Sequence, residues 1–429
     1  MQKLRPLKSI VFTILNSYSQ IFFSQSKVLG GLLILASFFD IWAGFYGLLS
    51  VVAANITAYL SGFSKQNSQN GLYGFNALLV GLGIGFYYQP SIELTALVLF
   101  AAILSILITL AVEGVFYKYS LPFLSVPFII SLWLVFTASL NFDALQLSER
   151  NLFTYNELYA LGGKNFTENY GYIQNYECSP NITTYLMSLG AIIFQPNILA
   201  GVLVFIGLLH YSRIALTLSI LGFFAAFAFY SLLGSDFNEL AYNNIGFNYI
   251  LTSIAVGGFF IIPSLRSYLW VLLLLPITVI ITVSSQKILA QFGLAVYALP
   301  FNMVVLLFLY VMKLRLFPSK LEVNYTGQKS PEESLYLNKT QNLRFKNKPS
   351  VDIALPFWGE WKVTQGYNGK YTHKGEWQHA LDFEISDASG STYKNEGDLP
   401  SDYYCYEKYV SAPADGTVAD IIDNISDNK

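Results

Sequence analysis

Three ionisable side chains near the end of the chain have the types and the spacing of metal ligands. His373 and Asp382 lie nine positions apart, and His379 lies three positions before the aspartate. A hydrolytic zinc usually takes three protein ligands and leaves one position open for water. No histidine follows His379, so this stretch could supply at most part of a metal site. Otherwise both histidines are surface residues of a β-type domain.

A repeated trio indicates a different chemistry in the rest of the chain. Gly-Phe-Asn occurs at positions 74–76 and again at 246–248, within stretches that are apolar and rich in glycine. Backbone that glycine or proline frees inside a membrane is tolerated only where protein or a water-filled path satisfies it. Glycines also let helices pack closely, which is the alternative for a lone glycine. For the matched trios we predict turns that line a pore.

The composition requires an integral membrane protein. The chain of 429 residues is 54% hydrophobic and only 12% charged, against about 25% charged in an average soluble domain. The lipid bilayer is therefore its expected partner, and the net charge of -2 gives no indication of nucleic-acid binding. The apolar runs lie at 29–60, 75–86, 94–112, 121–140, 186–210, 214–233, 247–262, 269–283 and 294–316.

Three landmarks recur in the same order at nearly the same offset, which predicts an internal duplication. LGG at 29–31 corresponds to LAG at 199–201, the two trios correspond to each other, and LPFLSVPF at 121–128 corresponds to LAVYALPF at 294–301. Each half has about five segments, and two copies with an odd number of spans are inverted in the membrane. The predicted fold is therefore an all-α polytopic membrane protein, built as an inverted repeat of two five-span halves.

The predicted domains follow the changes in composition. Residues 1–162 form the first membrane repeat (the first half), and residues 163–318 form the second (the second half). A charged linker follows at 319–350, and residues 351–429 have the alternation of a partial all-β domain. Cys178 and Cys405 fall in different predicted domains, so we treat both as free thiols.

Charge is scarce where a solute would pass. Between residues 29 and 140 the charged residues are few, and all but Asp40 lie near the ends of segments. Ion-coupled carriers usually keep acids or bases inside the membrane, because a buried charge is costly and is retained for function. A neutral solute is therefore expected. Asp40 beside Trp42 is interpreted as a residue at a helix end or near the interface, with a coupling carboxylate as the alternative.

At these residues the sequence resembles the urea transporter family, over about residues 10–316. The resemblance rests on both Gly-Phe-Asn trios, the apolar residue four positions after each phenylalanine, and the Leu-Pro element of each half. It implies a passive urea channel in each protomer of a homotrimer, with ten crossing helices, two half-spanning pore helices and no cofactor for transport. Carried over to this sequence, the pore residues are Gln20, Phe23, Phe75, Leu79, Ser125, Phe247, Leu251 and Ala298.

The residue types agree with this chemistry, although two positions depart from the family pattern. A slit between aromatic and aliphatic walls fits a flat, uncharged solute, whereas an ion would lose its hydration shell there without replacement ligands. The threonines that the family has at the midpoint are here Ser125 and Ala298, so one hydroxyl is missing. No acid occurs near Gly190, where the polar pore residue of the second half is expected. Short amides related to urea therefore remain candidate substrates.

The tail is similar to the start of the LytM-type (M23) zinc peptidases, over about residues 351–420. In that family a His and an Asp, with a later His from a His-x-His pair, hold one zinc. His373 and Asp382 match the first two, with His379 as the alternative ligand, so the resemblance implies a zinc site in the complete domain. APADGTV at 412–418 matches the β-hairpin that follows the Asp. The expectation is that the sequence stops before the His-x-His pair, with an inactive relic as the alternative.

Basic residues near both ends of the membrane part predict that both ends are cytoplasmic. Lys3, Arg5 and Lys8 precede the first span, and Lys313 and Arg315 follow the last one. The first stretch lacks the compact apolar core and the cleavage site of a signal peptide. We expect a multi-pass protein of the inner cell membrane of a bacterium. Two other functions remain: a membrane-anchored zinc metallopeptidase of cell-wall peptides, and an ion-coupled carrier of a small amide.

Overall fold

The computed structural model describes residues 4–149, 154–174, 180–234, 246–315, 321–324, 329–344, 353–387, 389–414, 416, 418 and 421. The chain forms two compact units, residues 1–346 and 347–429.

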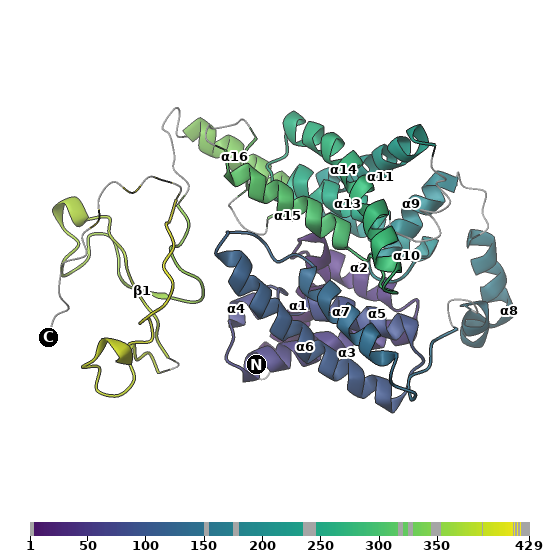
Figure 1. The fold of residues 1–429 in the computed structure, drawn as a ribbon, viewed down its shortest axis with the longest axis horizontal. Helices are drawn as coiled ribbons and strands as arrows, with labels where there is room; N and C mark the ends of the chain where they lie inside the picture. The colour runs from purple at the N-terminus through teal and green to yellow at the C-terminus, as the bar shows by residue number, and fades with distance from the viewer. Residues whose placement is uncertain are drawn as a thin grey trace. The chain divides into compact units, whose positions relative to one another are not determined.

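The described part of the first unit consists mainly of helices. In Figure 1 the purple and blue helices of the first half gather in one layer, and most of the teal and green helices of the second half lie in the other. The helices of the first half are α1 (Leu4–Ser19), α2 (Lys27–Ser37), α3 (Ile41–Leu60), α4 (Lys65–Gln69), α5 (Phe75–Tyr87), α6 (Ile92–Tyr117) and α7 (Val126–Ser139). Those that follow are α8 (Thr154–Gln174), α9 (Pro180–Ala191), α10 (Ile198–Tyr211), α11 (Arg213–Leu232), α13 (Phe247–Ile254), α14 (Leu265–Ala290), α15 (Leu299–Lys313) and α16 (Pro331–Arg344).

Several of these helices have the length and apolarity of membrane spans. Within the described part of the chain, α3, α6, α11 and α14 qualify singly, and α1 with α2 would make a fifth span that is bent by 86°. The helices α5, α7, α10, α13 and α15 are apolar but shorter. Because a helix needs about 20 apolar residues to cross the hydrocarbon core, these five do not qualify as spans by length alone. The prediction of a helical multi-pass membrane protein is confirmed.

Two breaks between helices have the same local geometry in the two halves. After α1 the chain makes one 3-10 turn, and Phe23 then adopts a left-handed backbone with φ of 57° before α2 begins. Between α9 and α10, Phe194 has a φ of 58°. In both breaks a backbone N–H bonds back across the turn, from Ser24 to Ser19 O at 3.1 Å and from Gln195 to Gly190 O at 3.0 Å. These bonds satisfy backbone groups that the broken helices leave free.

The segment after the last membrane helix packs on the second half. The backbone N–H of Ile262 donates to Glu322 O at 2.9 Å, and that of Asn324 donates to Phe260 O at 2.8 Å. In the helix α16, Glu332 Oε1 accepts a bond of 2.9 Å from the backbone N–H of Ile214, at the N-terminus of α11. A carboxylate is favourable at this position because the helix dipole leaves partial positive charge there. Part of the stretch that composition identified as a linker is therefore attached to the membrane unit.

The second unit contains a two-stranded antiparallel sheet. Its strands are β1 (Lys362–Gln365) and β2 (Asp382–Glu384), with Val363 opposite Phe383. Phe357 is buried and stacks on Trp361, with ring centroids 4.3 Å apart. Within this unit the predicted hairpin at 412–418 lies partly outside the described residues.

Candidate functional site

A cavity of about 760 Å³ lies in the membrane unit and is lined by both halves. Its walls come from the first break (Gln20 to Phe23), from α5, from the loop before α7, and from the corresponding segments of the second half. The lining residues are Gln20, Ile21, Phe23, Leu72, Phe75, Leu79, Phe86, Tyr87, Pro122, Phe123, Leu124, Ser125, Phe128, Ala191, Ile192, Phe194, Pro196, Phe247, Leu251, Phe259, Phe260, Gln286, Ala290, Leu294, Ala295, Val296, Tyr297, Ala298, Phe301 and Asn324.

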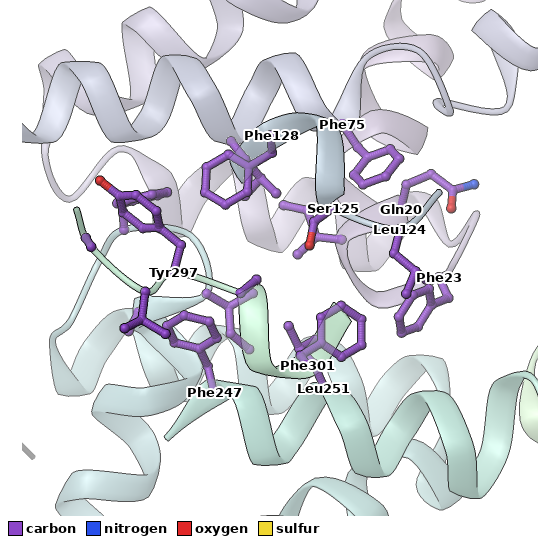
Figure 2. Close-up of a pocket in the computed structure, with 18 of the residues that line it drawn as sticks. Gln20, Phe23, Phe75, Leu124, Ser125, Phe128, Phe247, Leu251, Tyr297 and Phe301 are labelled. Carbon is purple, nitrogen blue, oxygen red and sulfur yellow. The ribbon is translucent and has the colours of Figure 1, made fainter. Parts of the chain in front are cut away.

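All eight residues that the sequence predicted as pore residues line this one cavity. They are Gln20, Phe23, Phe75, Leu79, Ser125, Phe247, Leu251 and Ala298. Figure 2 shows Phe75, Gln20 and Phe23 at one end of the space, and Phe128, Tyr297 and Phe247 at the other, with Ser125 between them. The fold thus brings together residues that are up to 278 positions apart in the sequence. Their role in solute binding stays a prediction.

The two asparagines of the trios fix the loops that carry the middle of the cavity. The Asn76 side chain donates to Leu124 O at 3.2 Å and accepts from the backbone N–H of Phe128 at 3.2 Å. In the second half, Asn248 donates to Tyr297 O at 3.0 Å and accepts from the backbone N–H of Phe301 at 3.2 Å.

These loops need such support because their backbone is strained. Leu124 and Tyr297 both lie in the left-handed region, with φ of 47° and 45°, which non-glycine residues rarely adopt. Asn76 and Asn248 are completely buried, and each satisfies one orphan N–H in the first turn of the following helix. The asparagines therefore hold Ser125 and Ala298 in place at the ends of these loops.

Aromatic rings form much of the wall. Phe75 stacks on Phe123 with centroids 5.9 Å apart and planes 23° apart. Phe23 stacks on Phe259 at 4.9 Å and approaches Phe301 at 6.1 Å. Parallel rings present flat apolar faces with few polar atoms, so this wall suits a flat solute whose polar groups lie at its edges.

Polar groups in the lining are few and neutral. Among the described residues that line the cavity, none is Asp, Glu, Lys, Arg or His. Gln20 donates to Asn70 O at 2.8 Å from one end of the site. An ion entering this space would lose its hydration without gaining charged ligands. The cavity therefore favours an uncharged solute.

Asp40, the carboxylate considered for ion coupling, has a structural role. Its Oδ1 accepts from the backbone N–H groups of Trp42 at 3.0 Å and Ala43 at 3.1 Å, which caps the N-terminus of α3. It is absent from the cavity lining. The interpretation as a helix-end residue agrees with this geometry.

The sequence predicted only part of the cavity lining, and three of the residues that it missed at this site are informative. Phe194 and Tyr297 line the cavity, and their counterparts under the duplication are Phe23 and Leu124, so the offset itself could have identified them. Asn302 was also missed; it donates to Ser125 Oγ at 2.9 Å across the two halves. Its counterpart in the first half is an isoleucine, so the duplication gives no signal, and only a lone amide in an apolar helix marks it.

The predicted metal ligands of the tail are brought together in part. His373 Nε2 lies 3.1 Å from Asp382 Oδ1, and His373 Nδ1 lies 2.9 Å from Gly366 O. His379 packs edge-to-face on Tyr367, with ring centroids 5.4 Å apart. No group of three metal-ligating side chains occurs in the described ranges. Two ligands do not fit a hydrolytic zinc, which needs three, so we derive no hydrolytic step here.

Comparison with known proteins agrees with the geometry of the membrane unit. Residues 11–313 match the family model described as urea transporter. The chain is similar to urea transporter 1 of Ovis aries, with 26% identity over 310 residues that cover 69% of this chain and 75% of the relative. It has the same similarity to urea transporter 1 of Capra hircus, again 26% over 310 residues.

Proposed function

Because residues 11–313 place this chain in the urea transporter family, we propose that it conducts urea passively through the cavity between its two halves. The observation that carries this proposal is the convergence of eight predicted residues on one apolar cavity whose described lining is uncharged. Urea is flat and neutral, and it carries hydrogen-bonding groups at its edges. Its faces would lie against rings such as Phe75 and Phe247, while its edges exchange hydrogen bonds with neutral oxygen and nitrogen atoms.

Selectivity in this mechanism comes from desolvation. Urea leaves water with a modest cost, because hydrogen bonds inside the site replace part of its hydration. A cation meets aromatic and aliphatic walls that cannot replace its water shell. Permeation should therefore need no coupled ion and should follow the urea gradient alone.

Stopped-flow light scattering on proteoliposomes tests the proposal. With an inward urea gradient, liposomes that contain the full chain should recover their volume faster than empty liposomes of the same lipid. The rate should not change when a proton or sodium gradient is imposed, which separates a channel from an ion-coupled carrier. Equal rates of urea entry with and without protein would contradict the proposal of a urea channel. A rate that follows the imposed proton or sodium gradient would favour an ion-coupled carrier.

The architecture that we propose for this function is an inverted repeat. It is supported by the paired breaks at Phe23 and Phe194 and by the paired loops held by Asn76 and Asn248. In this arrangement α5 and α13 are half-spanning pore helices, and the two halves meet around a pseudo-two-fold axis. A homotrimer in the inner membrane, with both ends cytoplasmic, completes the proposal. Crosslinking in liposomes would test the homotrimer. Labelling of single cysteines near each end would test on which side of the membrane the ends lie.

For the second unit the candidate function is that of a LytM-type domain, and the His373–Asp382 pair is the observation that favours it. With two of three ligands, the unit should not retain zinc at one ion per chain. Elemental analysis of the purified full chain after dialysis, beside a His373→Ala variant, measures this. Equimolar zinc that is lost in His373→Ala would show that a further ligand completes the site.

A further inference from the structure

A buried amide lies directly behind the midpoint of the cavity. Asn302, in the first turn of α15, is 1% exposed and makes three hydrogen bonds with its side chain. Its Nδ2 donates to Ser125 Oγ at 2.9 Å and to Ala298 O at 2.6 Å, and its Oδ1 accepts from the backbone N–H of Ser125 at 3.1 Å. It therefore contacts both residues that line the midpoint.

The chemistry of these partners fixes which way the amide points. The backbone N–H of Ser125 can only donate, so it must face the amide oxygen of Asn302. The backbone carbonyl of Ala298 can only accept, so it must face the amide nitrogen. Both constraints give the same orientation, and the second N–H of that nitrogen then points at Ser125 Oγ.

This orientation determines what the Ser125 hydroxyl offers to a solute. A hydroxyl has one donor and two acceptor positions, and Asn302 occupies one of the acceptor positions. Among the residues that the structure describes, none accepts the Ser125 hydroxyl proton. Ser125 lines the cavity, so this proton is directed into the space where the solute passes.

The equivalent positions in the other half are apolar. Ala298 is the N-cap residue of α15 as Ser125 is of α7, and Ile129 corresponds to Asn302. The second half therefore has a methyl group where the first half has a hydroxyl, and an amide four positions later. The midpoint has one hydroxyl, and a side chain from the opposite half orients it.

We infer that Asn302 is a specificity-determining residue that acts through Ser125, an inference that rests on the proposed urea channel. By holding the hydroxyl oxygen, it makes Ser125 donate a hydrogen bond to the carbonyl oxygen of the solute at the midpoint. The site then selects solutes with a strong acceptor between two amino groups. Solutes of the same shape that lack a strong acceptor pass less readily.

Urea and thiourea are the probes for this inference, because both are planar and carry the same amino groups. Sulfur is a weak acceptor, so the oriented hydroxyl should favour urea. In proteoliposomes Ser125→Ala and Asn302→Leu should each lower the urea-to-thiourea permeability ratio by about two- to tenfold, the value of one neutral hydrogen bond. The double variant should lower it no further than Ser125→Ala does, because Asn302 acts only through the Ser125 hydroxyl, which that variant already lacks. Ile129→Val, at the matched position, should leave the ratio unchanged.

The outcomes separate this inference from the proposed function. If the unaltered chain does not accelerate urea entry, the urea channel itself fails. If the unaltered chain conducts urea but Ser125→Ala leaves the urea-to-thiourea ratio unchanged, the inference that the Ser125 hydroxyl selects the solute is wrong. Effects that add in the double variant would show that Asn302 acts otherwise than through Ser125. Should Asn302→Leu fail to fold, Ser125→Ala alone still decides whether the hydroxyl discriminates.

Discussion

Asn76 and Asn248 illustrate how single polar residues fix this site. Each is completely buried, and each bonds both to a carbonyl in a left-handed loop and to the N–H of a helix start. The neighbouring phenylalanines line the cavity, whereas the asparagines build the loops opposite them. The repeated trio therefore combines one residue for the wall with one for the support.

Replacing either asparagine should destabilise the fold. Asn76→Ala leaves the Phe128 N–H and the Leu124 carbonyl without their partner, and each buried unsatisfied group costs about 1–3 kcal/mol. Asn248→Ala should behave alike. Thermal unfolding of the full chain in detergent measures the effect, with Asn141→Ala, at an exposed position, as the control. Unfolding temperatures that match the control would contradict the supporting role.

Removing a ring from the wall should relax solute selection. Phe75→Ala and Phe247→Ala each widen the slot, so bulkier amides such as N-methylurea should enter more readily relative to urea, by a factor on the order of ten. The control is Phe100→Ala, since Phe100 on α6 is 71% exposed and absent from the cavity lining. Light-scattering rates for both solutes give the ratio. The slot assignment is wrong if neither variant differs from the control.

At the scale of elements, a glycine packs closely against a serine in two helix pairs, one in each half. The helix that carries the glycine in one half corresponds to the helix that carries the serine in the other. Gly81 on α5 packs against Ser50 on α3, and an added Cβ would lie 2.2 Å from Ser50 Oγ. Gly222 on α11 packs against Ser253 on α13, where an added Cβ would lie 2.1 Å from Ser253 Oγ. The serine and the glycine have changed places between the halves, so each pair keeps one small and one polar residue. Such close approach positions α5 and α13 at the cavity.

These contacts predict a clear effect of one methyl group. Gly81→Ala and Gly222→Ala overpack the interface and should each destabilise the chain by about 1–3 kcal/mol. Gly114→Ala is the matched control, because Gly114 also lies in a helix but an added Cβ meets nothing within 4 Å. That change should be neutral or stabilise by up to about 1 kcal/mol. Thermal unfolding of the three variants would reject the close contact if all behaved alike.

At the scale of the whole molecule, the two halves line a cavity whose described lining carries no group that titrates near neutrality. Asp40, the carboxylate that was considered for ion coupling, instead caps the N-terminus of α3. The segment 321–324 also reaches the site, since Asn324 lines the cavity and its side chain donates to Phe259 O at 2.8 Å. The residues after the last membrane helix thus contribute to the wall.

Urea flux should therefore not depend on pH. Between about pH 5.5 and 8 the permeability of proteoliposomes should stay constant within twofold, because histidine is the side chain whose ordinary pKa falls in that range. The measurement needs the same pH on both sides of the membrane, so that no proton gradient forms. A steep change with pH, while the protein stays folded, would point to a titrating group at the pathway.

The sequence alone determined that this is a membrane protein, because its composition is strongly apolar and poor in charge. Its recurring landmarks predict a duplication, and both kinds of information can be read without the fold because they are properties of single positions and of spacing. The eight pore residues were predicted from the resemblance to the urea transporter family, and all eight line the cavity. The partnership of Asn302 with Ser125, the loops at Leu124 and Tyr297, and the attachment of residues 321–324 were decided only by tertiary structure. They depend on backbone conformation and on contacts between residues far apart in the chain. The counterpart of Asn302 under the duplication is Ile129, so only the folded chain places the Asn302 amide behind the Ser125 hydroxyl.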